Sequence, residues 1–289
     1  MQRKKLKKQK QIIVIGSLCL LLCLCVGYAA FQTQLSIRAK GNVKEKPNCE
    51  FGGIKVNTVV EGDGLYKDEY EEGKCTYKGA NPNNYITFNN ETWRIISIGS
   101  DNTIKIIRNE SIGDLVWDDS NASGWIGNAD WARPSVINSY LNDTYLPTIT
   151  TNANKIVIHD FNIGEITVSN DDLAGQISDE SSSTWNGKVG LITASEYIRA
   201  NSNKEECGTY SLNNSNTDIC TNTNWMPESM WTITPISPLW RRVVAIGEAY
   251  FSNSVYALDS KPTVPALYLN SNTQLSGNGS ESDPYTIVE

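Results

Sequence analysis

The sequence contains a single histidine, His159, and lacks the short motifs of the commonest hydrolytic enzymes. A Ser-His-Asp or Cys-His mechanism needs a positioned histidine, and His159-Asp160 is the only pair that offers one. Adjacent residues on a strand point to opposite faces, and the chain has no Gly-x-Ser-x-Gly or Ser-x-x-Lys sequence. We therefore interpret His159 as a structural residue and predict that the protein is not an enzyme.

Sequence signals for cofactors and metals are also missing. The chain has no phosphate-binding loop, no Gly-x-Gly-x-x-Gly before a helix and no Cys-x-x-Cys pair. Acidic pairs of the kind that hydrolyse glycosides occur at Asp118-Asp119 and Asp171-Asp172, but in Asn- and Ser-rich stretches typical of a solvated surface. We predict no cofactor and no metal, and a glycosidase-type enzyme is the less favoured alternative.

Positive charge is scarce beyond the first ten residues. Six of the 25 Lys and Arg residues lie there, so 19 remain beside 32 Asp and Glu in the rest of the chain. Nucleic-acid affinity depends on clustered basic side chains. An acidic body of this kind predicts that nucleic acid is not a partner.

One long apolar run follows the basic start. Ile12 to Phe31 has twenty residues without a charge, enough to span a hydrocarbon core of about 30 Å as a helix. The preceding Lys and Arg predict a cytoplasmic N-terminus and an extracellular C-terminus. We expect a cytoplasmic segment at 1–11, an anchor in the lipid bilayer at 12–31, a stalk at 32–46 and an extracellular domain at 47–289. Cleavage after Ala29, which would give a secreted protein, is the alternative.

Seven cysteines divide into two groups. Three lie in the apolar run and are interpreted as membrane residues, and four lie beyond it: Cys49, Cys75, Cys207 and Cys220. An even number in an exported region indicates disulfides. Proximity in the chain favours Cys49 with Cys75 and Cys207 with Cys220, although three connectivities are possible.

Strand signals outnumber helix signals in the extracellular part. Trp93–Ile98 and Thr103–Arg108 alternate around a Gly and Asn turn, which predicts a β-hairpin with Tyr85–Phe88 alongside. Helical spacing predicts one helix over Ser135–Leu146 and a second over Thr193–Ala200, the latter with a Thr193/Glu196 capping box. The sum is an α+β domain of short strands, two helices and long loops.

Composition predicts two loop regions. Trp117, Trp125 and Trp131 are expected to pin a long loop to the core, with sugar stacking as the alternative. The Ser-, Asp- and Glu-rich stretch 171–185 is expected to be a surface excursion.

The predicted binding surface lies between two core strands, Trp231–Pro235 and Pro265–Leu269. Aromatic and Arg side chains dominate binding patches because they offer large contact area with few rotors. The candidate ligand-binding residues are Trp240, Arg241, Arg242, Tyr250, Phe251, Asn253 and Tyr256. We predict contact with an extracellular protein or glycan; a structural cell-envelope protein without a small ligand is the alternative.

The same frame carries a family resemblance. Trp231–Pro235, Pro265–Leu269, Gly277–Ser280 and Asp283–Ile287 resemble the C-terminal half of a bacterial surface-protein domain family of unknown function. That family is similar to the C-type-lectin-like fold, including the variable proteins of diversity-generating retroelements. The resemblance implies this fold from about residue 85 onward and a display role for residues 236–264. Here Val264 replaces the Arg that usually precedes Pro-Ala-Leu, so its charge pairing does not carry over.

Overall fold

The computed structural model describes residues 48–119, 135–167, 172–203, 207, 220, 222–237, 242–247 and 251–288, without the side chains of 48 and 251–254. All of them belong to the unit Pro47–Glu289. The predicted anchor at 12–31 and stalk at 32–46 lie outside the described residues. Within the described ranges, no helix is long and apolar enough to cross a membrane.

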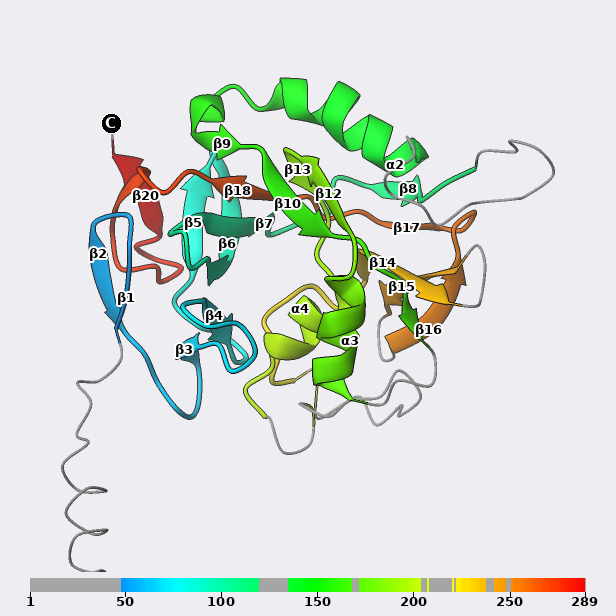
Figure 1. Ribbon diagram of the computed structural model, residues 1–289. Helices are drawn as coiled ribbons and strands as arrows, with labels where there is room; N and C mark the ends of the chain where they lie inside the picture. Colours follow the sequence, from blue (N-terminus) through cyan, green and yellow to red (C-terminus); the bar gives the residue numbers. More distant parts are fainter. Residues whose placement is uncertain are drawn as a thin grey trace, which may run out of the picture. The chain divides into compact units, whose positions relative to one another are not determined.

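A ten-stranded sheet forms the centre of the described part (Figure 1). Its principal strand order is β13-β18-β7-β6-β5-β20-β19, with β3 beside β4, β4 also beside β6, and β9 beside β18. The strands are β3 (Gly64–Lys67), β4 (Cys75–Lys78), β5 (Tyr85–Phe88), β6 (Glu91–Ile98), β7 (Ile104–Arg108), β9 (Ile156–Val157), β13 (Val189–Gly190), β18 (Ala266–Leu269), β19 (Gln274–Ser276) and β20 (Tyr285–Val288).

The hairpin of β6 and β7 is the predicted one, and β5 pairs with β6 as expected. Its turn closes through a bond from Gly99 N to Thr103 O, and Asn102 adopts a positive φ of 63°. Asparagine tolerates this left-handed conformation better than most residues. The predicted strand at Pro265–Leu269 is β18, which pairs with β7.

A second sheet has the order β11-β14-β15-β16, and three two-stranded sheets complete the described strands. The second sheet contains β11 (Ile166–Thr167), β14 (Met230–Ser237), β15 (Arg242–Ile246) and β16 (Phe251–Tyr256). The pairs are β1 (Asn48–Phe51) with β2 (Ile54–Asn57), β8 (Asp114–Val116) with β17 (Ser260–Pro262), and β10 (His159–Asn162) with β12 (Thr184–Gly187).

The strand predicted to end at Pro235 continues to Ser237. The β14–β15 register is irregular between Trp231 and Pro235, and Pro235 lies opposite Val243. Proline lacks an N–H and is tolerated in sheets at irregular positions of this kind.

The described residues contain three α-helices instead of the two predicted. They are α2 (Val136–Ser139), α3 (Leu173–Glu180) and α4 (Ala194–Arg199). The helix α2 continues as a π-helical turn, η2 (Tyr140–Tyr145), and a 3₁₀ turn, η3 (Leu146–Thr148), and another 3₁₀ turn, η4 (Ala153–Lys155), precedes β9. Together α2, η2 and η3 cover the predicted helix 135–146.

The stretch 172–185, expected as a surface excursion, lies largely at the surface but contains a helix that the sequence did not predict. Asp172 caps α3 by accepting from Ala174 N and Gly175 N, and Leu173 and Glu180 are buried. Polar composition concealed the cap and the spacing of the inward-facing residues. In Figure 1, α3 lies beside α4.

Four apolar residues at helical spacing in 135–146 were expected to face the core, and two of them do. Ile137 and Leu141 are fully buried, whereas Val136 and Tyr140 are exposed. Residues four apart share one side of a helix, so the buried pair marks the true contact stripe.

Two tryptophans connect β14 of the second sheet to the β8 segment. Trp117 Nε1 donates to Thr232 O (3.1 Å), and Trp231 Nε1 donates to Leu115 O (2.8 Å). Both rings are fully buried, which confirms the packing interpretation for Trp117. Trp125 and Trp131 lie outside the described residues.

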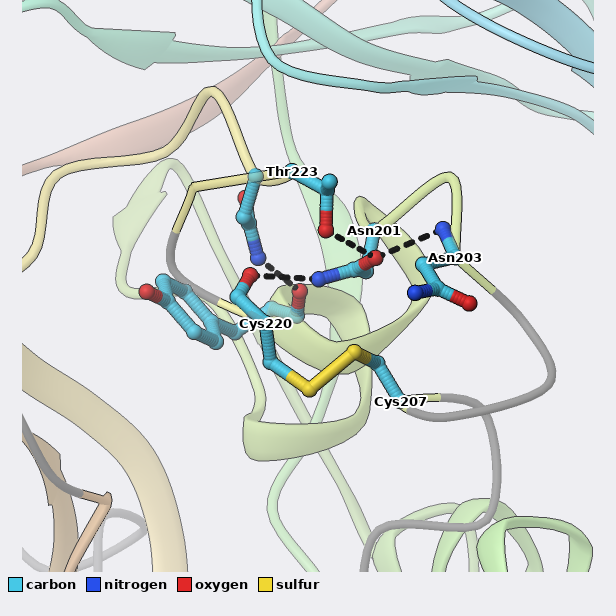
Figure 2. Close-up of a disulfide and its surroundings, with 7 residues drawn as sticks. Asn201, Asn203, Cys207, Cys220 and Thr223 are labelled. Atoms are coloured by element: carbon cyan, nitrogen blue, oxygen red, sulfur yellow. Dashed lines mark hydrogen bonds between the residues drawn. A yellow bond between two sulfur atoms is a disulfide. The ribbon is translucent and has the colours of Figure 1, made fainter. Parts of the chain in front are cut away.

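Both favoured cysteine pairings are confirmed. Cys49 and Cys75 join β1 to β4 with their Cα atoms 6.5 Å apart, and Cys207 and Cys220 are bonded at 5.6 Å. Figure 2 shows the second bridge, where the Asn201 side chain donates to the carbonyl of Cys220 and accepts from Thr223 Oγ1. These hydrogen bonds of Asn201 link the segment after α4 to the disulfide-bonded Cys220 and to Thr223.

The double variant Cys49→Ser/Cys75→Ser should lower the free energy of unfolding by about 3 kcal/mol, because the open chain regains loop entropy in the unfolded state. Urea unfolding by circular dichroism would measure this. Cys207→Ser/Cys220→Ser should show a loss of similar size. Unchanged unfolding in both variants would contradict the structural role.

Candidate functional site

A cavity of about 420 Å³ opens among the β6–β7 turn, β10, α4 and the loop between β3 and β4. Small-molecule sites usually measure about 300–1,000 Å³ and are mostly apolar. This one is lined by hydroxyls, carboxylates, an amide and basic side chains, with Tyr268 and His159 as its aromatic members. Such a lining suits a strongly polar ligand.

A buried ion pair between Lys105 and Glu196 forms part of the cavity lining. Lys105 Nζ lies 2.6 Å and 2.8 Å from the two Glu196 carboxylate oxygens, and the side chains are 3% and 9% exposed. The ammonium is also 5.3 Å from the ring centre of Phe161 and 5.1 Å from that of Tyr268. The two rings shield the pair, and shielding strengthens its electrostatic interaction.

Local structure positions both partners. Lys105 lies between Ile104 and Ile106 on β7, and the alternation of a strand turns its side chain away from their face. Glu196 is the third residue of α4 and completes the predicted capping box, because Glu196 Oε2 accepts from Thr193 N at 2.9 Å. Burial raises the pKa of the Glu196 carboxyl, but Lys105 and Lys74 outweigh it and hold that pKa below its ordinary value.

Arg199 binds the loop between β3 and β4 to the same helix. It lies three residues after Glu196 on α4 and pairs with Asp68 and Glu71, the second at 2.6 Å. Burial acts against the Arg199 charge, but the two carboxylates outweigh it and raise the Arg199 pKa. Lys74 Nζ adds a contact to Glu71 at 2.8 Å. Burial and the Arg199 charge lower the Lys74 pKa.

His159 lies on the cavity wall. Its ring stacks on Tyr268 with centres 3.8 Å apart and planes at 9°. His159 Nε2 is 3.4 Å from Thr103 Oγ1 and 3.5 Å from Asp101 Oδ2. The sequence-based interpretation of this histidine as structural accounts for the stack but did not anticipate a place at the cavity.

Glu180 is buried and accepts hydrogen bonds from Ser195, a residue of the cavity lining. Its carboxyl accepts from the Ser195 hydroxyl, from Ser195 N (3.2 Å) and from Thr234 Oγ1 (2.7 Å). Burial raises its pKa, against the opposing effect of these hydrogen bonds. Ser195 lines the cavity, and its hydroxyl is already engaged by Glu180.

The predicted binding surface is described only in part. Trp240, Arg241 and Tyr250 lie outside the described residues; Phe251 and Asn253 are on β16, but their side chains also lie outside the description. Arg242 and Tyr256 face each other across β15 and β16, with the guanidinium carbon 4.1 Å from the ring centre. Tyr256 is 49% exposed. Neither residue lines the cavity.

Sequence reasoning missed the charged residues of the cavity. Lys105 carried a usable signal, because a lysine inside the run Ile104–Ile107 must find a partner when its strand is buried. The loop carboxylates Asp68 and Glu71 carried no such signal, since their partner Arg199 is more than a hundred residues away.

Within the described ranges, no group of three or more His, Cys, Asp or Glu residues could hold a metal ion. Comparison of the chain with protein-family models, curated proteins and solved structures gave no match.

Replacing Lys105 with Met should reduce the free energy of unfolding by about 3–5 kcal/mol at neutral pH, because Glu196 is left buried and unpaired. Unfolding in urea would measure the loss, with the exposed Lys188→Met as the control.

The pH dependence follows from the lowered Glu196 pKa. The stabilisation from ionised Glu196 is present above its unfolded pKa and is lost as pH falls through the folded pKa. In Lys105→Met this stabilisation is removed, so the difference from the parent protein should shrink in acid. Adding Glu196→Gln should recover part of the loss at neutral pH. A deficit independent of pH would contradict the ion-pair account.

Proposed function

We propose that the protein is an exported binding module whose polar cavity holds a small, hydroxyl-rich ligand such as a saccharide unit. The observation that carries this proposal is the lining of the 420 Å³ cavity, where hydroxyl, carboxylate and amide groups surround the His159–Tyr268 stack. Sugar hydroxyls are recognised by such polar groups, and sugar rings pack on aromatic surfaces.

Export is supported by the two disulfides. Bonds of this kind persist in oxidising compartments and are rare in the cytosol. The proposed location is the cell surface, with residues 12–31 as a single-pass anchor in the bilayer, or the medium after cleavage at Ala29.

The proposed fold family is the C-type-lectin-like one. Two observations support it. The core strands Trp231–Pro235 and Pro265–Leu269, which carry the family resemblance, correspond to β14 and β18, and the described part has a mixed α+β organisation. Between these two strands, the exposed Tyr256 belongs to the proposed surface, whereas Val243–Ile246 of β15 are buried.

Binding without catalysis is the proposed activity, and the engagement of the polar groups supports it. Glu196 is held by Lys105, Ser195 by Glu180, and His159 is stacked on Tyr268. A general acid or a nucleophile needs access to the reacting atoms, and these contacts engage the Glu196 carboxylate and the Ser195 hydroxyl.

Blocking the cavity should abolish saccharide binding. Thr184 is exposed and lines the cavity, whereas Lys188 is exposed nearby on the chain and does not. In titration of the full-length chain with a panel of monosaccharides, Thr184→Trp should weaken binding at least about tenfold, or 1.4 kcal/mol. Lys188→Trp should leave it unchanged. Equal affinity in the two variants would reject the cavity as the site.

A second contact surface is favoured by the Arg242–Tyr256 stack, in which Tyr256 is exposed and Arg242 is half-buried. A rigid ring with a guanidinium above it is a frequent feature of protein and glycan contacts. This surface shares no residue with the cavity lining. It would contact a protein or a larger glycan, whereas the cavity holds a small ligand.

Arg242→Ala/Tyr256→Ala should weaken binding to protein or glycan arrays at least about tenfold, since hot-spot truncations often exceed 1 kcal/mol. Lys55→Ala/Tyr140→Ala removes one exposed basic side chain and one exposed tyrosine from separate elements and serves as the control. Full retention of binding would reject the patch. Ligand-free self-association that the first variant abolishes would favour the cell-envelope alternative.

A further inference from the structure

The basic side chains that line the cavity are already neutralised. Lys105 is bound by both oxygens of Glu196, and Arg199 is bound by Asp68 and Glu71. Lys74 contacts Glu71. An anionic ligand could recruit Lys105 or Arg199 only by displacing Glu196 or Asp68, which would remain buried and unpaired, and this is strongly unfavourable.

Carboxylates, in contrast, remain accessible from the cavity. The Asp101 side chain is 54% exposed, and Glu72 and Asp160 are exposed residues of the same lining. Five carboxylates and three lysines or arginines line the cavity in all. The accessible charge is therefore negative, even though the buried part of the lining is neutralised.

The rest of the chain also carries a net negative charge. Beyond the first ten residues, 19 basic residues face 32 acidic ones, so the domain as a whole attracts cations. A cleft of one sign inside a like-signed surface concentrates oppositely charged ligands and speeds their association.

We propose that the cavity selects an amine-bearing saccharide, with the ammonium group beside the accessible carboxylates and the hydroxyls on the remaining polar lining. This inference rests on the proposed function and adds the charge of the ligand to it. Asp160 and Glu72 are the selecting residues, because neither is one of the carboxylates that neutralise Lys105, Arg199 and Lys74.

The test uses three probes built on the same pyranose ring: glucosamine, N-acetylglucosamine and glucuronate, which are positive, neutral and negative at neutral pH. The full-length chain is titrated with each probe at low ionic strength. Glucosamine should bind at least about tenfold more tightly than glucuronate, with N-acetylglucosamine between them. Added salt should narrow the range, because exposed charges are screened.

The variant Glu72→Gln/Asp160→Asn should reduce the preference for glucosamine over N-acetylglucosamine at least threefold. Glu61→Gln/Asp259→Asn makes the same charge change at exposed residues outside the cavity lining and should leave the preference unaltered. Both pairs are exposed, so folding should survive, and circular dichroism would verify it.

The outcomes separate this inference from the proposed function. Binding of N-acetylglucosamine or glucuronate as tight as that of glucosamine would overturn the charge selection and leave the saccharide site standing. An equal effect of the two double variants would also overturn it, since long-range charge alone would then explain the preference. If none of the probes binds, both the inference and the saccharide site fail.

Discussion

The ion pair between Lys105 and Glu196 is the constraint around which the described part of the protein is arranged. Lys105 comes from the central hairpin of the ten-stranded sheet, and Glu196 comes from the first turn of α4. Two opposite charges with little access to water tolerate little separation, because each depends on the other for solvation. The pair therefore fixes the helix against the sheet and sets one wall of the cavity.

Arg199, another charged residue of the cavity wall, is linked to this ion pair through the helix α4. Glu196 also caps its own helix, and Arg199 one turn later holds the loop that contains Asp68 and Glu71. The Cys49–Cys75 bridge is anchored directly after that loop, at the start of β4. The segments that form the cavity are distant in the sequence. Buried ion pairs join them inside, and the Cys49–Cys75 disulfide joins β1 to β4 at the edge of the cavity.

The proposed binding relies on polar contacts and not on apolar burial, because the cavity lining is mostly polar. The buried basic groups are satisfied before any ligand arrives, so they contribute rigidity, and the accessible carboxylates and hydroxyls remain for recognition. Preorganised polar groups lose less entropy on binding than mobile ones. The Arg242–Tyr256 stack does not line the cavity and belongs to the second proposed surface.

The sequence by itself determined the features that depend on neighbours in the chain. The β6–β7 hairpin, the capping box at Thr193 and the two disulfides follow from local alternation, fixed spacing and short loops. The helix α3 was missed because its cap and buried stripe lie in a polar stretch that resembles a loop. Only the tertiary structure decided the cavity, because Lys105, His159 and Glu196 meet through sheet pairing and helix docking between distant segments. Ion pairing of this kind leaves no periodic pattern in one sequence.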